Sequence, residues 1–457
     1  NSNIKLLLVK IISEMQYVQF LSKIISYLND YNIYNDVIQY LKNFDYKLVE
    51  NSIIKKLHNS DSFNINYIKT LGDLGNQTSL KILIKSALVL NDYNEKLMET
   101  IITSCNKIIK RNNINLLYKG ELKELIISRF QRAYVLLDTI YIIQNFKKNK
   151  LFLDYMFEKL DNEIHIILNY INMIYKDKEF STFVFILNSN DLKSKSNLLD
   201  FFENKYSREI CSQLIPLIND STIEEKYKLL NQKFIHNRLS IKKVITTFCN
   251  SDSDFQKIIA IDLLIKNNLD NLLSKINCSD IMQNIFIIEM ILKEKRFFNS
   301  KIIKQLYSYI DKEKLKEPTP MYTTLDITLI LKDIELFSNL TNDDIFYIAK
   351  IAKIENFIKN EIIFEKGEEG DAMYIVLDGS VSIFNGNNEI AILGAGECFG
   401  ELALLDGEPR STSIKSIDDT IVIKISKEEF YSLISDKIEI IKGIIKILSS
   451  RLRNTIS

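Results

Sequence analysis

The sequence predicts a multidomain fold, in which an all-α N-terminal region is followed by a β-roll (jelly roll) with flanking helices. Residues 1–315 contain only three of the twelve glycines and one of the four prolines, and their apolar residues recur at three- and four-residue intervals. Eight glycines lie between Gly367 and Gly407, where tight turns between short strands need them. We therefore expect a helical domain over 1–315, a linker over 316–323 and a β-roll domain over 324–457.

Two segments of the helical region read as helical hairpins. Residues 64–88 place Gly72 and Gly75 between two amphipathic stretches, and residues 252–276 place Asn267, Asn268 and Asp270 in the same position. This layout resembles HEAT repeats, whose helix pairs stack into a superhelix. The repeats show no exact period, so an irregular helical bundle is the alternative.

The linker and the flanking helices have their own signals. Pro318 and Pro320 lie in KEPTPMY (316–322), ahead of the amphipathic stretch TLDITLILKDIELF. Thr341 and Asp344 have the spacing of a capping box, so residues 324–357 are expected to be a helical lead-in. The β-roll is expected over about 358–426, and two further helices are expected over 427–434 and 438–453.

The run FGELALLDGEPRSTS (399–413) has the chemistry of a phosphate site. A helix that opens at Gly400 and Glu401 presents unpaired backbone N–H groups and a positive dipole end. Arg410 adds a planar guanidinium that matches two oxygens of one phosphate, and Ser411 adds a hydroxyl. Glu401 repels a phosphate but is an acceptor for a sugar hydroxyl. The alternative is an ordinary helical turn in which Arg410 pairs with Glu401 or Asp371.

Residues 331–435 resemble the cyclic nucleotide-binding domain of catabolite-activator proteins, kinase regulatory subunits and gated channels. The resemblance rests on the 399–413 run and on an upstream pattern formed by Gly370, Asp371, Tyr374, Gly379 and Val381. It implies that cyclic AMP or cyclic GMP is the ligand, with Glu401 on the ribose 2′-hydroxyl, Arg410 on the cyclic phosphate and Ser411 assisting. The expected binding cassette consists of Gly400, Glu401, Leu402, Ala403, Arg410, Ser411 and Thr412. Family members that bind nucleotide often carry Ala-Ala or Thr-Ala after the arginine, so Ser411 and Thr412 leave the choice of base open.

A second resemblance covers more of the chain. The order of helical repeats, Pro-containing hinge and cyclic nucleotide domain is similar to the soluble C-terminal part of bacterial proteins that fuse an ATP/ADP-translocase-like transporter to such modules. This resemblance implies a regulator on the cytoplasmic face of a membrane, with a transporter domain or another protein as partner. In the cyclic nucleotide-binding family the last helix closes over the base or forms a dimer seam, so we expect the helices of 427–453 to act as a lid or 438–453 to form the seam of a homodimer.

Composition and charge argue against several further classes of function, so we expect none of them in this chain. Basic and acidic residues number 59 each with no dense basic cluster, so we expect no nucleic-acid partner. Five separated cysteines and three isolated histidines predict a reducing, cytoplasmic environment without a metal site or cofactor. We expect a cyclic nucleotide-sensing regulator without enzymatic activity of its own. The alternatives are the regulatory region of a translocase-like transporter and a scaffold that binds no nucleotide.

Overall fold

A computed structural model gives the arrangement of the chain. It describes residues 2–30, 32–58, 64–89, 95–112, 119–147, 149–176, 179–187, 192–231, 239–269, 272, 284–293, 304, 321–334, 337, 340–386, 388–402, 407–436, 445 and 449. The chain forms two compact units: Asn1–Tyr141 with Lys159–Arg238, and Ile142–Glu158 with Leu239–Ser457. The second unit thus combines the β-roll with helices from the predicted N-terminal domain, while most of the predicted linker at 316–323 lies outside the described residues.

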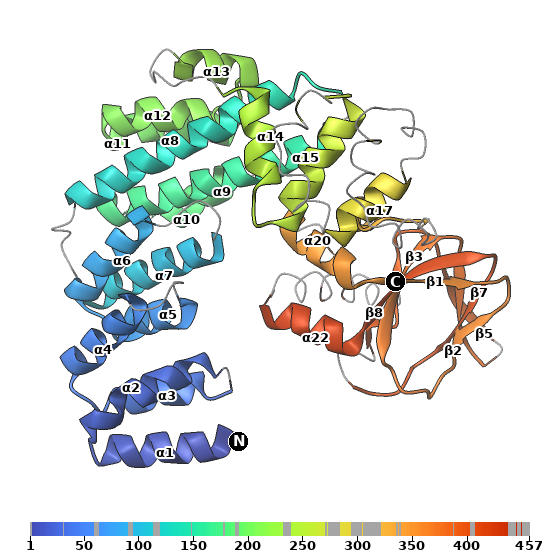
Figure 1. The fold of residues 1–457 in the computed structure, drawn as a ribbon, viewed down its shortest axis with the longest axis horizontal. Coiled ribbons are helices and arrows are strands. Elements are labelled where there is room, and N and C mark those ends of the chain that lie inside the picture. Colours follow the sequence, from blue (N-terminus) through green and yellow to red (C-terminus); the bar gives the residue numbers. More distant parts are fainter. Residues whose placement is uncertain are drawn as a thin grey trace. The chain divides into compact units, whose positions relative to one another are not determined.

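The first unit is built from helices, as predicted (Figure 1). Its elements are α1 (Ser2–Glu14), η1 (Val18–Phe20), α2 (Leu21–Ser26), η2 (Tyr27–Asn29), α3 (Tyr34–Leu41), α4 (Tyr46–His58), α5 (Ile65–Leu74), α6 (Gln77–Val89), α7 (Glu95–Asn112), α8 (Lys119–Ile143), most of α9 (Lys150–Tyr175), α10 (Phe180–Leu187), α11 (Leu192–Lys205), α12 (Arg208–Ile218) and α13 (Ile223–Asn231). The predicted hairpin over 64–88 corresponds to α5 and α6, whereas HEAT-type stacking of such hairpins stays a prediction.

Close backbone approach explains one glycine of the α5–α6 hairpin. A Cβ on Gly72 would lie 2.6 Å from Ser104 Oγ on α7, which is shorter than any normal contact. The guanidinium of Arg111, also on α7, donates to the Gly72 carbonyl at 3.0 Å and to the Asp73 carbonyl at 2.5 Å. These carbonyls belong to the last turn of α5 and have no partner within their own helix. Helix α7 therefore packs against α5 and also caps its end.

Carboxylates of one helix also cap the N-termini of others. Buried Glu50 on α4 accepts from the backbone N–H of Ser79 in the first turn of α6 at 3.0 Å, and from the Ser79 hydroxyl. In the second unit, Glu158 accepts from the N–H of Asn342 at the start of α20 at 2.8 Å. The first N–H groups of a helix have no partner within it, so each of these carboxylates satisfies a donor and ties two helices together.

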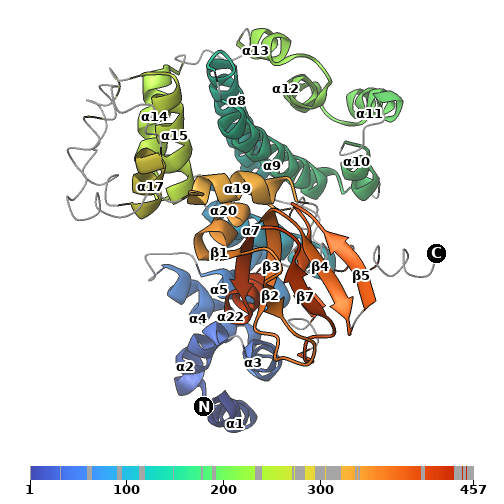
Figure 2. The same cartoon turned by 90° about the vertical axis from the view of Figure 1, so that its right-hand side faces the viewer.

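The second unit contains the roll, the helices around it and the first part of α9. Its helices are α14 (Ile241–Cys249), α15 (Asp254–Lys266), α17 (Ile285–Lys293), α19 (Thr324–Lys332), α20 (Asn342–Ile351) and α22 (Lys427–Asp436). Its strands are β1 (Lys353–Phe357), β2 (Ile362–Phe364), β3 (Ala372–Asp378), β4 (Val381–Asn385), β5 (Asn388–Leu393), β6 (Cys398–Phe399), β7 (Ser413–Ser416) and β8 (Thr420–Ser426). They form two antiparallel four-stranded sheets, β1-β8-β3-β6 and β2-β7-β4-β5, which confirms the β-rich C-terminal domain (Figure 2).

Three boundary predictions need correction or completion. The roll begins at Lys353, not near 358, because KIENF pairs as strand β1 with β8 instead of extending the helical lead-in. Thr341 is the N-cap of α20, as predicted, and its hydroxyl accepts from the N–H of Asp344 at 3.2 Å, while a capping box that was not predicted, formed by Thr323 and Asp326, begins α19. Helix α22 corresponds to the predicted helix 427–434. Most of 438–453 lies outside the described residues.

Two apolar cores stabilise the roll, and one of them also holds it to its lead-in helices. One core lies between the sheets and contains Phe364, Tyr374 and Phe399. The other joins α19 and α20 to the opposite face of sheet β1-β8-β3-β6, and it includes Leu331, Ile348, Ile375, Cys398 and Ile423. None of the helices among the described residues has the length and apolarity that a bilayer-spanning segment needs.

The Glu50 cap can be tested by its removal. We expect Glu50→Ala to leave the Ser79 N–H and hydroxyl buried without this acceptor, which costs about 1–3 kcal/mol. Hydrogen exchange of the α6 amides should show that loss as a lower free energy of local opening. The exposed Glu14→Ala on α1 is the control, and equal protection of α6 in both variants would contradict the capping role.

Candidate functional site

The predicted phosphate arginine lies where the two sheets meet. Arg410 precedes β7 of one sheet, while Ala372 begins β3 of the other and Gly400 follows β6. Strand β3 pairs with β6 through Tyr374–Phe399 and Ile375–Cys398, which brings the start of β3 and the end of β6 together. Three segments that are distant in sequence therefore meet at Arg410.

The turn between β2 and β3 holds the backbone of Arg410. The Gly367 N–H donates to the Arg410 carbonyl at 2.8 Å, and the Arg410 N–H donates to the Glu368 carbonyl at 2.8 Å. Gly367 has φ +92°, a left-handed conformation that side chains rarely adopt. Gly367 thus permits the turn that fixes the backbone position of Arg410.

The guanidinium of Arg410 is held from two sides, and the residue as a whole is only 4% exposed. Its Nη1 donates to the Gly400 carbonyl at 2.9 Å and its Nη2 to the Ala372 carbonyl at 2.7 Å. Asp371 Oδ1 lies 3.6 Å from Nη2. The buried Nε has no hydrogen-bond partner among the residues that the structure describes. The alternative pairing of Arg410 with Asp371 is therefore present, but the guanidinium still has an unused donor.

The electrostatics of this group reflect burial against neighbouring acids. Burial lowers the pKa of the Arg410 guanidinium, and three nearby carboxylates oppose that shift: Asp371, Glu368 and Glu401. Arginine nevertheless stays protonated in proteins. The site therefore contains a full positive charge in a nearly buried position, which is costly unless an anion or several dipoles compensate it.

Gly400 is required by the position of Arg410. Its φ is +76°, and a Cβ on this residue would lie 2.7 Å from Arg410 Nη1 and 3.2 Å from the Ala372 carbonyl oxygen. Both the backbone conformation and the space exclude a side chain here. The predicted first residue of the cassette thus has a direct steric role.

The other predicted cassette residues have different surroundings. Glu401 is 3% exposed, and it is helical together with Leu402, which is 44% exposed. Ser411 is exposed and Thr412 is partly exposed. Ala403 lies outside the described residues. The structure thus brings Gly400, Glu401 and Arg410 together, and the assignment of the whole set to a nucleotide stays a prediction.

Sequence reasoning missed two parts of the site. Phe364 lies against the guanidinium, with 4.1 Å between its ring centroid and Arg410 Cζ, and the Ala372 carbonyl accepts from Nη2. Nothing in the local sequence reveals a backbone acceptor, but an aromatic residue before the Gly-rich turn was a usable signal. Among the described residues no group of three or more His, Cys, Asp or Glu side chains could hold a metal ion.

Comparison with known proteins identifies this region. Residues 354–437 match the family model of the cyclic nucleotide-binding domain. The chain is 29% identical over 131 residues to a CRP-like cAMP-activated global transcriptional regulator of Mycobacterium tuberculosis, covering 28% of this chain and 58% of that protein. It is 30% identical over 114 residues to a cAMP-dependent protein kinase regulatory subunit of Debaryomyces hansenii, covering 25% of each chain.

Among solved structures, the catabolite activator protein of Thermus thermophilus is 28% identical, with 26% of this chain and 59% of that chain covered and a TM-score of 0.26. The chain spans little more than half of the bacterial regulator and a quarter of the kinase subunit. The C-terminal region of this chain is a cyclic nucleotide-binding domain of the type found in catabolite activators and kinase regulatory subunits.

Proposed function

We propose that this chain is a cyclic nucleotide sensor whose β-roll binds cyclic AMP or cyclic GMP and thereby modulates the helical region. The observation that carries the proposal is the buried Arg410, whose Nε–H has no partner among the described residues. A cyclic phosphate has two free oxygens with one shared negative charge, which suits the Nε edge of a guanidinium. Arg410 would hold the phosphate, Glu401 would accept from the ribose 2′-hydroxyl, and Ser411 would assist.

The existing contacts of Arg410 are compatible with this role. Asp371 is 3.6 Å away and its side chain is 73% exposed, so its ion pair with Arg410 is weak and screened by water. The bonds to the Gly400 and Ala372 carbonyls leave each Nη one further N–H. A phosphate could therefore displace Asp371 without breaking the bonds that position the guanidinium.

The proposed modulation has a physical route within the second unit. Cys398 on β6 packs in the same core as α19 and α20, and Gly400 of the site follows directly after β6. A shift of the cassette is thereby coupled to these two helices, because packed cores resist continuous deformation. Modulation additionally requires that α19 and α20 contact the remaining helices.

Helix α20 makes those contacts at both of its ends. Lys350 Nζ lies 2.9 Å from Asp254 on α15, and the Asn342 N–H donates to Glu158 on α9. Between them, the Phe346 ring lies 5.3 Å from that of Phe255 on α15. Helix α20 is thus fixed to α9 and α15 on one face, while its other face packs against the roll.

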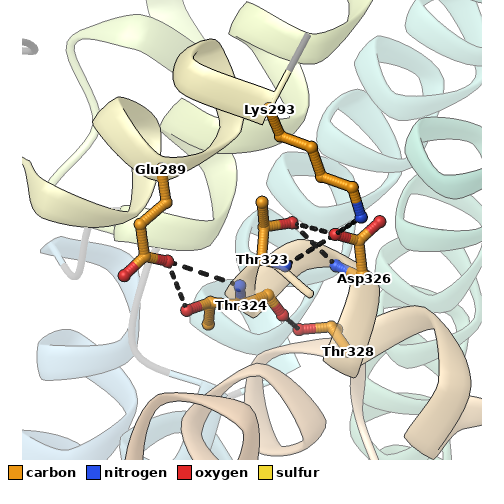
Figure 3. Close-up of polar contacts among 6 residues, drawn as sticks. All are labelled: Glu289, Lys293, Thr323, Thr324, Asp326 and Thr328. Atoms are coloured by element: carbon orange, nitrogen blue, oxygen red, sulfur yellow. Dashed lines mark hydrogen bonds and ion pairs between the residues drawn. The ribbon is translucent and has the colours of Figure 1, made fainter. Parts of the chain in front are cut away.

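Helix α19 is attached to α17 through its first turn (Figure 3). Asp326 accepts from Lys293 at 2.7 Å and from the Thr323 N–H at 2.7 Å, so one carboxylate serves both the capping box and the neighbouring helix. The Thr324 hydroxyl donates to Glu289 at 3.0 Å. Glu289 and Lys293 are one turn apart on α17, and together they hold the start of α19 in place.

The predictions about partners of the helical region rest on the sequence alone. A protein partner, a transporter domain and a homodimer through 438–453 stay predictions. A nucleotide-free scaffold is the alternative function, and the first experiment below separates it from the sensor.

Calorimetric titration of the 457-residue chain with cyclic AMP and with cyclic GMP tests the binding site. We expect saturable binding of at least one nucleotide and at least a tenfold weaker affinity in Arg410→Ala, because charge-assisted bonds to phosphate contribute about 1.5–3 kcal/mol each. Lys359→Ala removes an exposed positive charge of the roll and should bind like the unchanged protein. Unaltered affinity in folded Arg410→Ala would refute the site, and no binding of either nucleotide would favour the scaffold.

Hydrogen exchange tests the proposed modulation. We expect nucleotide to change the protection of α15 amides in the unchanged chain, and Lys350→Met combined with Glu158→Ala to reduce that change while nucleotide still binds. Lys266→Met is the matched control, since it removes a 2.7 Å ion pair with Asp262 within α15 that does not involve α20. Bound nucleotide without any effect on α15 would count against this route.

A further inference from the structure

The ring of Phe364 lies under the guanidinium of Arg410. Arg410 Cζ is 4.1 Å from the centroid of this ring and 5.9 Å from that of Tyr374. Phe364 is 7% exposed and Arg410 4%, so little water competes for either surface. A cation within about 6 Å of an aromatic face is attracted by the ring quadrupole, and the attraction is strongest where water is excluded.

A β-bulge gives Phe364 this position. Ile362 pairs with Lys415 and Phe364 with Ile414, so two steps along β2 correspond to one step along β7. Successive side chains of a regular strand face opposite sides, yet Ile363 and Phe364 both pack against the core between the sheets. The bulge therefore turns the phenyl ring inward at the point where Arg410 passes over it.

Two carbonyls and one ring together restrict the guanidinium. The Gly400 and Ala372 carbonyls accept from Nη1 and Nη2 and so fix its rotation within its own plane. The ring of Phe364, whose centroid is 4.1 Å from Arg410 Cζ, limits movement of the guanidinium toward its own side. The buried Nε–H, which has no partner in the described part of the chain, is then kept in one direction.

We propose that Phe364 is a positioning residue of the nucleotide site, which holds the Arg410 guanidinium so that its Nε edge faces the cyclic phosphate. This inference rests on the proposed function. Phe364 does not touch the ligand in this arrangement and acts only through Arg410. Its aromatic face is what matters, so an aliphatic residue of similar volume cannot replace it.

The test compares three variants of the full chain in titrations with cyclic AMP and cyclic GMP. Phe364→Leu should weaken binding roughly tenfold, because it removes the ring face while keeping an apolar side chain. Phe364→Tyr keeps the face and should remain within about twofold of the unchanged protein. Val376→Ala creates a comparable defect in the same core away from Arg410, and it should also remain within about twofold.

A second measurement reports the geometry without any ligand. The NMR signal of the Arg410 Nε–H, assigned by its disappearance in Arg410→Lys, should carry a ring-current shift in the unchanged protein and in Phe364→Tyr but not in Phe364→Leu. Folded Phe364→Leu with unchanged affinity would overturn the proposal, and so would an equal loss of affinity in Val376→Ala. If the unchanged chain binds neither nucleotide, the proposed function fails. The ring-current comparison then tests separately whether Phe364 positions the Arg410 guanidinium, and the absence of a shift in the unchanged protein would overturn that role.

Discussion

The roll depends on one buried charge that links its two sheets. Arg410 emerges next to β7 of one sheet and donates to carbonyls at the start of β3 and after β6 of the other. Its backbone is fixed by the turn that follows β2. A guanidinium buried in this way is stable only because several dipoles and a ring surround it. The same arrangement favours a glycine at position 400, since a Cβ there would displace Nη1 from its bond to the Gly400 carbonyl and the φ of +76° disfavours a side chain.

Carboxylates that cap a neighbouring helix are the second recurring device. Glu50, Glu158 and Glu289 each accept a hydrogen bond from a backbone N–H in the first turn of a helix other than their own. Such a bond satisfies a donor that the helix cannot satisfy internally, and it also fixes where that helix starts. In the second unit, two of these bonds hold α19 and α20, the helices that share a core with sheet β1-β8-β3-β6. The roll is therefore joined to α19 and α20 by an apolar core, while carboxylates of α9 and α17 bind the first turns of these two helices.

Sequence reasoning predicted those parts of the fold that depend on local chemistry. The glycine-rich stretch and the Gly-Glu…Pro-Arg run indicated the roll and placed Arg410 and Glu401 in one site, and helical periodicity indicated the helices of 1–315. Strand β1 was missed because KIENF is short and follows a helix without a glycine or proline. The bulge at Phe364 and the acceptor carbonyl of Ala372 arise from the pairing of distant strands. Such features depend on tertiary structure and have no reliable pattern in a single sequence.

The acids around Arg410 have a consequence for selectivity among phosphates. Burial lowers the pKa of this one guanidinium, whereas Asp371, Glu368 and Glu401 each raise it, so all three carboxylates act electrostatically on the position where an anion would bind. A cyclic phosphodiester carries a single negative charge, whereas inorganic phosphate and linear nucleotide monophosphates carry close to two at neutral pH. Repulsion from the three carboxylates grows with the charge of the anion, while the attraction of one guanidinium must offset it. If the site binds a cyclic phosphate as proposed, these carboxylates disfavour dianionic phosphates more strongly than a singly charged cyclic phosphodiester.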